Sequence, residues 1–497
     1  MAEPRTDGEQ EPTPKDAGVD SRRRLRVVVP LTLVGVLVAV AGVVAVGLMA
    51  RQGTSRGVAS APSGTPPGSS SAPNAFSVDP NASSAAPSGA SAASLIAVID
   101  VSGALATMDE RGGSVVSYAA PGVVFGFPAW SPDGSRIAAV GYGPGDTSIY
   151  VFNVRPGGAG GDFKPVVIYR SPDRPPFYLY WAPDGRRLAF LATEPVGLSL
   201  RVAPADGSAP LDGSGAGAII RRGAPLYFDW VGADRLLVHV GSGSGAFAGE
   251  VGLDGASVAS PVAGTGDFRS ASVSGDGRYL AYVRSQTPSS GDLVVASRDG
   301  TSRHEVPVFS PTAFVFDPTG DTLASIAADA PVKDSLTFPL GPLRLVDARS
   351  GAVRTLLDSS VVGFFWAPDG RTIATLRLAR AGDQTADAGP AFSTARMVLP
   401  VAAATPPPAT EVRLAFVDVS TGVVRSERVV RLGSHFVNEL LPYFDQYAQS
   451  HRLWAPDSAS ILLPLVDAIG RTRLVVVPAD GTDSRPIADG LSGFWSP

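Results

Sequence analysis

Trp181-Ala182-Pro183-Asp184-Gly185 is the fullest copy of a phrase that recurs along this chain, and the mostly apolar run Arg187–Leu191 follows it. Proline presets the first central position of a tight turn, aspartate hydrogen-bonds to the backbone two residues later, and glycine takes the positive φ that other residues resist. The run after the turn and the aromatic before it supply bulky side chains that fill the space between stacked sheets. The stretch therefore predicts a hairpin between two strands.

The same phrase is repeated around all the tryptophans of the chain. They are Trp130, Trp181, Trp230, Trp366, Trp454 and Trp495, and two further copies carry Val273 or Phe316 instead. Successive copies lie 41 to 51 residues apart, except for one gap of 88. A second turn follows about 20 residues later, in 203–207, 298–300, 420–422 and 479–481. Two such turns per repeat imply four strands, and a period in the forties is the size of a four-stranded propeller blade.

The recurring aspartates are interpreted as turn residues and not as paired catalytic carboxylates. They are Asp133, Asp184, Asp276, Asp369 and Asp457. Each stands in the turn position where its side chain hydrogen-bonds to the local backbone. They therefore form a structural repeat together with the tryptophans, and the sequence indicates no catalytic, cofactor-binding or metal-binding residue.

At this point the chain resembles a family, the TolB-type propellers with WD-like aspartate repeats and the consensus Trp-Ser-Pro-Asp-Gly. The copies at 130–134, 181–185 and 366–370 match it well, the copy at 454–458 lacks the glycine, and the copy at 230–234 keeps little beyond its tryptophan. The resemblance covers about residues 94 to 497. It implies an all-β propeller and is nearly silent on function, because propellers have many unrelated activities.

The two ends of residues 94–497 are expected to build one shared blade. The C-terminal Phe494-Trp495-Ser496-Pro497 is the first strand of a repeat without a continuation, whereas 94–101, 104–108 and 114–118 look like three strands that lack an inner one. Joining them leaves no open edge in the ring. With the seven blades that begin near 130, 181, 230, 273, 316, 366 and 454, the count is eight; it is seven if the weak copy at Trp230 is misinterpreted.

The first 93 residues differ from the rest. Residues 27–50 form an apolar stretch of 24 residues without a charge, which is long enough to cross a hydrocarbon layer of about 30 Å as a helix. Arg22, Arg23, Arg24 and Arg26 precede it, so the positive-inside bias predicts a cytoplasmic tail (1–26) and a propeller outside the membrane. A cleaved signal peptide is the alternative, but its apolar region is typically only ~7–15 residues long.

Residues 51–93 are rich in Ser, Ala, Pro and Gly and are expected to be a disordered, flexible linker between the membrane helix and the propeller at 94–497. The chain has no cysteine, which excludes disulfides and a lipid-modified cysteine. A net charge of −5 without a basic stripe is evidence against binding to nucleic acid. The expected location is the cell membrane, with one membrane span and an extracytoplasmic propeller.

Three long irregular segments are expected on one face of the ring, opposite to the Asp-Gly turns. They are 327–340, 379–410 and 431–451. Irregular loops on a rigid scaffold commonly carry function. The segment 379–410, which contains Thr405-Pro406-Pro407-Pro408, is interpreted as a disordered insertion and less readily as a ligand.

Segment 436–447 carries four aromatic residues and is expected to form a short helix capped by Asn438, with its aromatics half exposed. It either plugs the mouth of the channel, packs on the sixth blade, or docks a partner. The candidate partner-binding residues are Phe436, Asn438, Glu439, Tyr443, Phe444, Asp445 and Tyr447.

The histidines do not indicate an enzyme. Of His239, His304, His435 and His451, only the last two fall in one loop, where a metal with Asp445 is a minor alternative to ordinary polar positions. The histidine cluster of the similar pectate-type lyases is missing, and no segment is large enough for the hydrolase domain of dipeptidyl-peptidase relatives.

Two functional hypotheses remain. The first is a membrane-anchored, non-enzymatic propeller that acts as a protein-binding scaffold or sensor in the bacterial cell envelope and needs no cofactor. The second is binding, or less readily turnover, of a small carbohydrate or peptide in the central channel. Neither predicts an oligomeric state.

Overall fold

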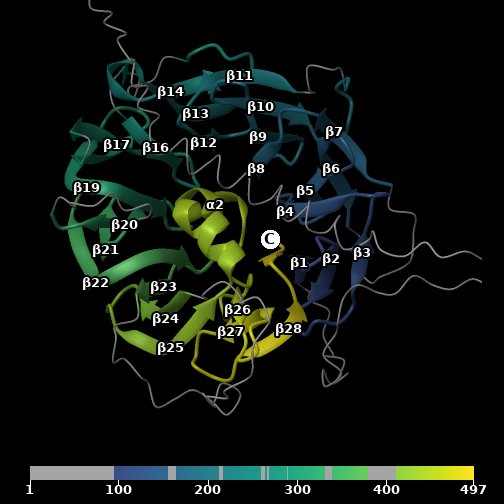
Figure 1. Ribbon diagram of the computed structural model, residues 1–497. Coiled ribbons are helices and arrows are strands. Elements are labelled where there is room, and N and C mark those ends of the chain that lie inside the picture. Colours follow the sequence, from purple (N-terminus) through teal and green to yellow (C-terminus); the bar gives the residue numbers. More distant parts are fainter. Residues whose placement is uncertain are drawn as a thin grey trace, which may run out of the picture.

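The computed structural model describes residues 94–154, 164–211, 217–258, 264–265, 268–287, 289–330, 339–378 and 410–497. Its strands form antiparallel sheets that follow one another around a ring in chain order, with the helix α2 (Phe444–Ser450) at the centre (Figure 1). The chain is thus an all-β propeller, as the repeats predict. The predicted tail, membrane helix and linker, residues 1–93, lie outside the described residues. Among the residues that are described, no helix is long and apolar enough to span a bilayer.

The sheet that joins the two ends of the chain confirms the predicted closure. Its strand order is β29 (Ser492–Trp495), β1 (Leu95–Ile99), β2 (Leu105–Asp109), β3 (Val116–Tyr118). Strand β29 pairs with β1 in antiparallel register, with Trp495 opposite Ile96. The C-terminal strand therefore supplies the inner strand that the N-terminal part of the sheet lacks.

Three further four-stranded sheets follow, each with its strands in chain order. The first contains β4 (Val124–Trp130), β5 (Arg136–Tyr142), β6 (Thr147–Asn153) and β7 (Val166–Ser171). The second contains β8 (Pro176–Trp181), β9 (Arg187–Thr193), β10 (Leu198–Pro204) and β11 (Ala218–Gly223). The third contains β12 (Leu226–Val231), β13 (Arg235–Val240), β14 (Phe247–Gly252) and β15 (Gly264–Thr265), with the short 3₁₀ turn η1 (Gly243–Gly245) before β14.

The remaining thirteen strands form one continuous hydrogen-bonded ladder from β16 to β28. Its strands are β16 (Phe268–Val273), β17 (Tyr279–Thr287), β18 (Ser290–Ser297), β19 (Arg303–Phe316), β20 (Thr322–Ala328), β21 (Gly341–Asp347), β22 (Val353–Trp366), β23 (Thr372–Leu378), β24 (Thr410–Asp418), β25 (Val424–Leu432), β26 (Ser460–Val466), β27 (Thr472–Pro478) and β28 (Arg485–Asp489). Strand β19 pairs with β18 through its first half and with β20 through its second half, and β22 divides in the same way between β21 and β23.

The repeated aspartates have the predicted turn role. In the turn after β4, Asp133 accepts hydrogen bonds from the Ser131 hydroxyl at 2.6 Å and from the Ser135 backbone at 3.1 Å. Partial burial opposes ionisation, but these hydrogen bonds prevail and lower the pKa of Asp133 to about 2. The other four copies accept the backbone N–H two residues on, each at 2.9 Å, in the turns of Asp184, Asp276, Asp369 and Asp457.

Five of the six tryptophans form a belt in which each indole links its repeat to the one before it, whereas the buried indole N–H of Trp495 has no hydrogen-bond partner among the described residues. The indole of Trp181 donates to the Ala129 carbonyl at 3.0 Å, and that of Trp130 donates across the closure to Phe494 at 2.9 Å. The same bond recurs from Trp230 to Tyr180, from Trp366 to Val315 and from Trp454 to Phe365. In every case the acceptor directly precedes the anchor residue of the previous repeat. The repeat spacing therefore places one indole at each of these junctions.

The junction at Val273, which has no indole, uses a different hydrogen bond. The carboxylate of Asp229 accepts the Val273 backbone N–H at 2.7 Å and its own neighbour's N–H, that of Trp230, at 2.8 Å. Asp229 is 3% exposed and also hydrogen-bonds with the Tyr180 hydroxyl. Burial is the main influence on its acidity and raises the pKa of Asp229 to about 7, against these hydrogen bonds. A buried carboxyl group thus holds two sheets together where the repeat lacks its tryptophan.

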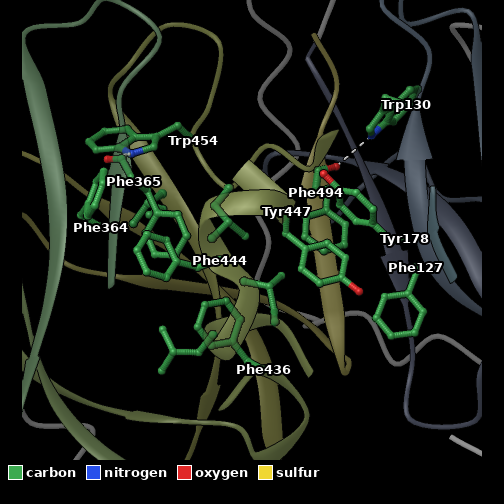
Figure 2. Packing of buried hydrophobic residues seen from close by; sticks show 14 of the residues in the cluster. Phe127, Trp130, Tyr178, Phe364, Phe365, Phe436, Phe444, Tyr447, Trp454 and Phe494 are labelled. Carbon is green, nitrogen blue, oxygen red and sulfur yellow. Dashed lines mark hydrogen bonds between the residues drawn. The ribbon is translucent and has the colours of Figure 1, made fainter. Parts of the chain in front are cut away.

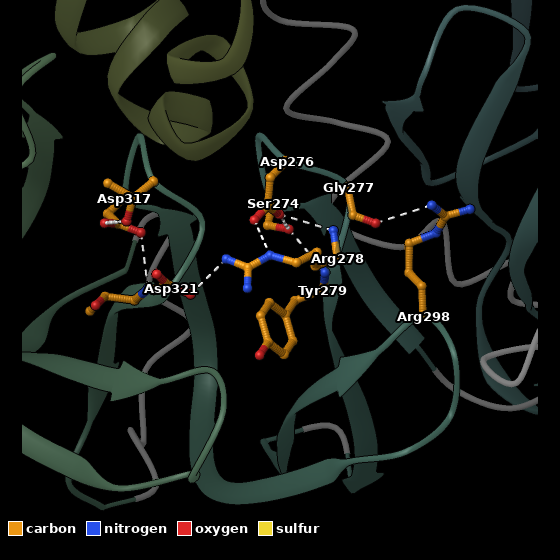
Figure 3. Close-up of polar contacts among 10 residues, drawn as sticks. Ser274, Asp276, Gly277, Arg278, Tyr279, Arg298, Asp317 and Asp321 are labelled. Atoms are coloured by element: carbon orange, nitrogen blue, oxygen red, sulfur yellow. Dashed lines mark hydrogen bonds and ion pairs between the residues drawn. The ribbon is translucent and has the colours of Figure 1, made fainter.

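Arginines connect neighbouring turns on the same side of the ring. Arg278 forms ion pairs with Asp276 of its own turn and with Asp321 of the next one (Figure 3). Arg298 donates to the Gly277 carbonyl at 3.0 Å and pairs with Glu250. We call this side, which carries the turns that follow the tryptophans, the turn face, and the opposite side the loop face.

The chain order of the strands assigns the long segments to faces. The ends of β20, β23 and β25, where segments 327–340, 379–410 and 431–451 begin, all lie on the loop face. Residues 331–338 and 379–409 lie outside the described residues. On the turn face, Ser496 and Leu95 bond to each other through their backbones at 2.8 Å, so the described chain begins there.

Candidate functional site

Residues 433–453, which we call the plug, enter the central channel from the loop face. The plug contains the π-helical turn η2 (Phe436–Leu440), the 3₁₀ turn η3 (Leu441–Tyr443) and α2. The predicted helix is therefore present, but its predicted cap is wrong. Asn438 lies inside η2, which begins after His435 without a side-chain cap.

The expectation that the aromatic residues of the plug are half exposed is also wrong for three of the four. Phe436, Phe444 and Tyr447 are 3%, 0% and 7% exposed, and only Tyr443 is partly accessible. Leu440 and Leu441 are buried beside them. The spacing of the apolar residues predicts the helix correctly. Spacing alone does not tell whether the propeller or a partner protein covers these apolar side chains.

One side of the plug packs against the sheet that contains β22 and β23. The Phe444 ring lies 5.2 Å from that of Phe364 and 5.8 Å from that of Phe365 (Figure 2). Gly363 makes room for this contact, because a Cβ atom there would lie 2.8 Å from Leu441 Cδ1. Packing on this sheet, one of the alternatives predicted for the segment, is thus confirmed.

On the other side, two strained residues receive Tyr447. Phe127 in β4 and Tyr178 in β8 each stand three residues before a tryptophan, and both have positive φ, 53° and 50°. Their rings lie 6.1 Å and 5.4 Å from that of Tyr447 (Figure 2). Left-handed backbone costs a bulky residue on the order of 1–2 kcal/mol, so the contacts with the plug offset a local strain that the repeat imposes twice.

Polar contacts fix α2 along the channel. The Tyr178 hydroxyl donates to the Gln446 carbonyl at 2.9 Å, and the Gln449 amide donates to the Ser272 hydroxyl at 3.4 Å. The Asp445 carboxylate accepts the backbone N–H of Gln446 and that of Phe314 in β19. Burial outweighs these bonds and raises the pKa of Asp445 to about 7. Asp445 is therefore part of the contact between the plug and the ring.

Glu439 lies at the loop-face end of the plug and remains partly accessible. Its carboxylate forms no hydrogen bond or ion pair with the described residues, and burial raises the pKa of Glu439 to about 7. Its negative charge also acts on the hydroxyl groups of Tyr142, Tyr443 and Tyr447. Asn438 beside it is exposed. Of the seven candidate partner-binding residues, Asn438, Glu439, Tyr443 and Asp445 therefore keep accessible surface.

The histidines are distributed over different surroundings. His239 stacks on Tyr227 with ring centres 5.6 Å apart, and His304 contacts the Arg349 carbonyl at 2.9 Å. His435 lies against Phe127, and His451 lies 4.6 Å from Phe494. Burial lowers the pKa of His435 to about 4 and that of His451 to about 3. Within the described part of the chain, no three metal-binding side chains converge.

Comparisons with known proteins do not assign this chain to a family. No family model and no curated protein sequence matches the chain. Similar solved structures include the dihydro-heme d1 dehydrogenase NirN (14% identity, TM-score 0.49, 81% of this chain and 75% of that one) and a eukaryotic initiation factor (11%, 0.47, 82% and 99%). TolB from Acinetobacter baumannii is also similar (12%, 0.34, 67% and 62%). Their TM-scores stay below 0.5, so neither a family nor an activity follows from them.

Proposed function

We propose that the protein is an eight-bladed propeller, tethered to the cell membrane by residues 27–50, whose loop face binds a protein of the cell envelope without catalysis. The blade count rests on the strand pairing. The four separate sheets count as four blades, and the ladder from β16 to β28 divides at β19 and β22 and between β25 and β26. Only one residue pair, Leu432 with Leu465, joins β25 to β26, which marks the third division.

The observation that carries the proposal is that the described strand ends from which the long segments begin lie on the face opposite to the start of the propeller. The linker (51–93) leads to Ser94 on the turn face, where Ser496 and Leu95 pair. The loop face, with the exposed Asn438 and the exposed Ile469 in the turn between β26 and β27, can then point away from the membrane. Ile469 is 75% exposed, as apolar residues of binding surfaces commonly are.

The plug favours this function over a ligand that passes through the channel. Five of its large apolar side chains, Phe436, Leu440, Leu441, Phe444 and Tyr447, are at most 7% exposed. Burial of each is worth roughly 1.5–3 kcal/mol, so withdrawal of the plug has a large free-energy cost. In the alternative function, a carbohydrate or peptide ligand could therefore bind only at one end of the channel.

A pull-down from membranes solubilised in non-ionic detergent tests the proposal. Deletion of residues 431–451 is unsuitable, because it removes the core of the ring as well as the surface. The full-length variant with Asn438→Arg and Ile469→Arg changes only exposed loop-face positions. We expect this variant to lose a protein that the wild type captures. The proposed partner would cover both positions, and the substitutions place a charge at each of them.

The matched control is Glu110→Arg, an exposed position in the turn between β2 and β3 on the turn face. It should capture the same proteins as the wild type. If the loop-face variant and the control both retain every partner of the wild type, the loop face is not the binding surface.

A further inference from the structure

The inner strand beside β26 consists of two short pieces. Leu432 pairs with Leu465 near the loop-face end of β26, and Trp454 pairs with Ile461 near its turn-face end. Between the two pieces the chain leaves the sheet, enters the channel as the plug and returns (Figure 1). The inner strands of other sheets, such as β8, are single strands.

The two pieces lie on β26 in one continuous register. Leu465 and Ile461 are four positions apart on β26, whereas their partners Leu432 and Trp454 are 22 positions apart. The excess is 18 residues, which is the length of residues 434–451, and we call these residues the insert. Without the insert, the two pieces would form one strand with no gap or shift along β26.

Backbone hydrogen bonds show where the chain leaves the sheet and where it returns. The Gly433 N–H donates to the Pro464 carbonyl at 2.9 Å, and the Leu462 N–H donates to the Leu453 carbonyl at 2.8 Å. Pro464 and Leu462 are two positions apart on one edge of β26, as the hydrogen-bonded positions of an antiparallel ladder are. The two ends of the excursion are therefore separated by only about 7 Å along the strand.

Gly433 and Pro464 account for an interruption at this point. Pro464 has no N–H and cannot return the hydrogen bond that it accepts from Gly433, so the ladder lacks one of its bonds there. A Cβ atom on Gly433 would lie 2.9 Å from Thr472 Cγ2, so a side chain at this position would displace Thr472. The insert thus begins at a close approach that suits glycine, opposite a residue that weakens the pairing.

The insert makes its own backbone hydrogen bonds, separate from those of the sheet. The helical turns η2, η3 and α2 are closed by bonds between its own residues. At its two ends, the Val437 N–H donates to the Gly433 carbonyl at 3.1 Å and the His451 N–H donates to the Tyr447 carbonyl at 2.7 Å. Removal of the insert would therefore leave the hydrogen bonds between β26 and the two pieces in place.

The channel wall receives the insert mainly through aromatic contacts. Phe444 packs on Phe364 of β22, and Tyr447 packs on Tyr178 of β8, with ring centres 5.2 Å and 5.4 Å apart (Figure 2). The Tyr178 hydroxyl also donates to the Gln446 carbonyl at 2.9 Å. Amphipathic helices of separate partners occupy apolar grooves in the same manner, with anchor residues on successive turns.

We propose that the central channel is a binding site for a short amphipathic helix with two aromatic anchors, and that the chain fills this site with its own insert. The molecule then has two components, a complete propeller and a ligand that is attached within one inner strand. The insert keeps any similar helix out of the channel, so the site becomes available only when the insert is absent. This site is independent of the protein-binding surface proposed for the loop face.

The full-length chain without the insert, with Gly433 joined to Arg452, tests the proposal in non-ionic detergent. The probe is a synthetic peptide of residues 434–451. The deletion keeps Gly433 on β26, and the peptide supplies the missing core. Alone, the deletion variant should melt cooperatively but below the wild type, because the channel has lost its apolar occupant. The peptide should bind to it saturably and raise its melting temperature, whereas the wild type, whose site is filled, should not bind the peptide.

Substitutions in the peptide distinguish a specific site from adsorption to apolar surface. Phe444→Ala should weaken binding roughly tenfold or more, because it removes a fully buried anchor. Asn438→Ala is the matched control, since it changes an exposed residue, and this peptide should bind like the unsubstituted one. A peptide that does not raise the melting temperature, or equal binding of the Phe444→Ala peptide, would overturn the proposal.

A deletion of residues 434–450 tests the register. It leaves His451 as one residue too many between the two pieces, and a shift of one residue turns side chains to the opposite face of a sheet. This variant should melt below the deletion of 434–451, and equal melting temperatures would contradict the continuous strand. If the deletion of 434–451 does not fold alone, it is refolded with each peptide. Recovery with the unsubstituted peptide but not with Phe444→Ala supports the proposal, and recovery with neither, or equally with both, overturns it.

Discussion

The tryptophan belt and the plug both hold the ring together, but they connect its parts differently. Each indole of the belt bonds only to the preceding repeat, as Trp181 does to Ala129. The plug contacts several inner strands at once, through Phe127 in β4, Tyr178 in β8 and Phe364 in β22. The belt is therefore a chain of local connections, whereas the plug is a hub.

This difference implies that substitutions in the belt and in the plug destabilise different parts of the propeller. A repeat protein is stabilised by its nearest-neighbour interfaces, so the loss of one interface can stay local. A closed ring with a central hub adds contacts between distant repeats, and their loss affects all strands around the channel. Hydrogen exchange can distinguish these effects, because it reports protection strand by strand.

The largest effect should come from Trp181→Ala. Trp181 is 3% exposed and its indole donates a buried hydrogen bond. Loss of the ring leaves a cavity between two sheets, with an expected decrease of about 5 kcal/mol in the free energy of unfolding. Chemical denaturation measures it, and exchange should increase mainly in β4–β7 and β8–β11.

Trp181→Phe is the control for this first prediction. It keeps an aromatic ring and loses the N–H donor, so it should cost less than half as much. Uniform loss of protection around the whole ring in Trp181→Ala would show that the belt is not a set of local connections.

Phe444→Ala should have the next largest effect, about 4 kcal/mol. The side chain is fully buried and packs against Phe364 and Phe365. In contrast to the belt variant, we expect exchange to increase in inner strands of several sheets, β4, β8 and β22 among them, because the hub loosens. Phe444→Leu should retain most of the stability. If hydrogen exchange increases in β22 and β23 alone, the plug stabilises only the strands that Phe444 contacts and does not connect the sheets around the channel.

The belt was predictable from the sequence because its chemistry repeats. The turn role of Asp184, the burial of Trp181 and the pairing of Trp495 with Ile96 follow from the phrase and its period. The plug occurs once, and its surroundings come from strands that are hundreds of residues away in sequence, as for Tyr178 and Gln446. Spacing predicted a helix there but could not predict what covers it.

The groups that sequence analysis missed have a partial signal. Phe127, Tyr178 and His451 all stand three residues before a tryptophan, at the position where the inner strand approaches the channel. Asp229 directly precedes the tryptophan of its own repeat, and in other repeats the backbone carbonyl at this position accepts the indole N–H of the next repeat. In the repeat that follows Asp229, valine replaces the tryptophan, and the Asp229 side chain bonds to this valine instead.

The smallest predicted effect concerns the junction at Val273, where Asp229 replaces the missing indole. Burial raises the pKa of Asp229 to about 7, above its value in the unfolded chain, so the native state binds more protons than the unfolded state between these two values. Its contribution is complete below the unfolded pKa and is lost as pH rises through about 7. Between pH 6.5 and 8 the loss should be about 0.8 kcal/mol.

Chemical denaturation at pH 6.5 and 8 measures this loss for the wild type and for Asp229→Asn. Between pH 6.5 and 8 the buried His435 and His451, whose pKa values are lowered, each add about 0.4 kcal/mol of stability, because the unfolded chain still protonates them near pH 6.5. This gain is common to the wild type and Asp229→Asn, so it cancels in their comparison. Glu439 and Asp445 also have a raised pKa, so their contributions to the stability of the protein also decrease as pH rises. The wild type should therefore become less stable with rising pH. Asp229→Asn should show a smaller decrease, because one of the three titrating groups is gone. An identical decrease in both proteins would mean that Asp229 does not titrate between pH 6.5 and 8, and that the junction without an indole does not depend on the protonation of this carboxyl group in that range.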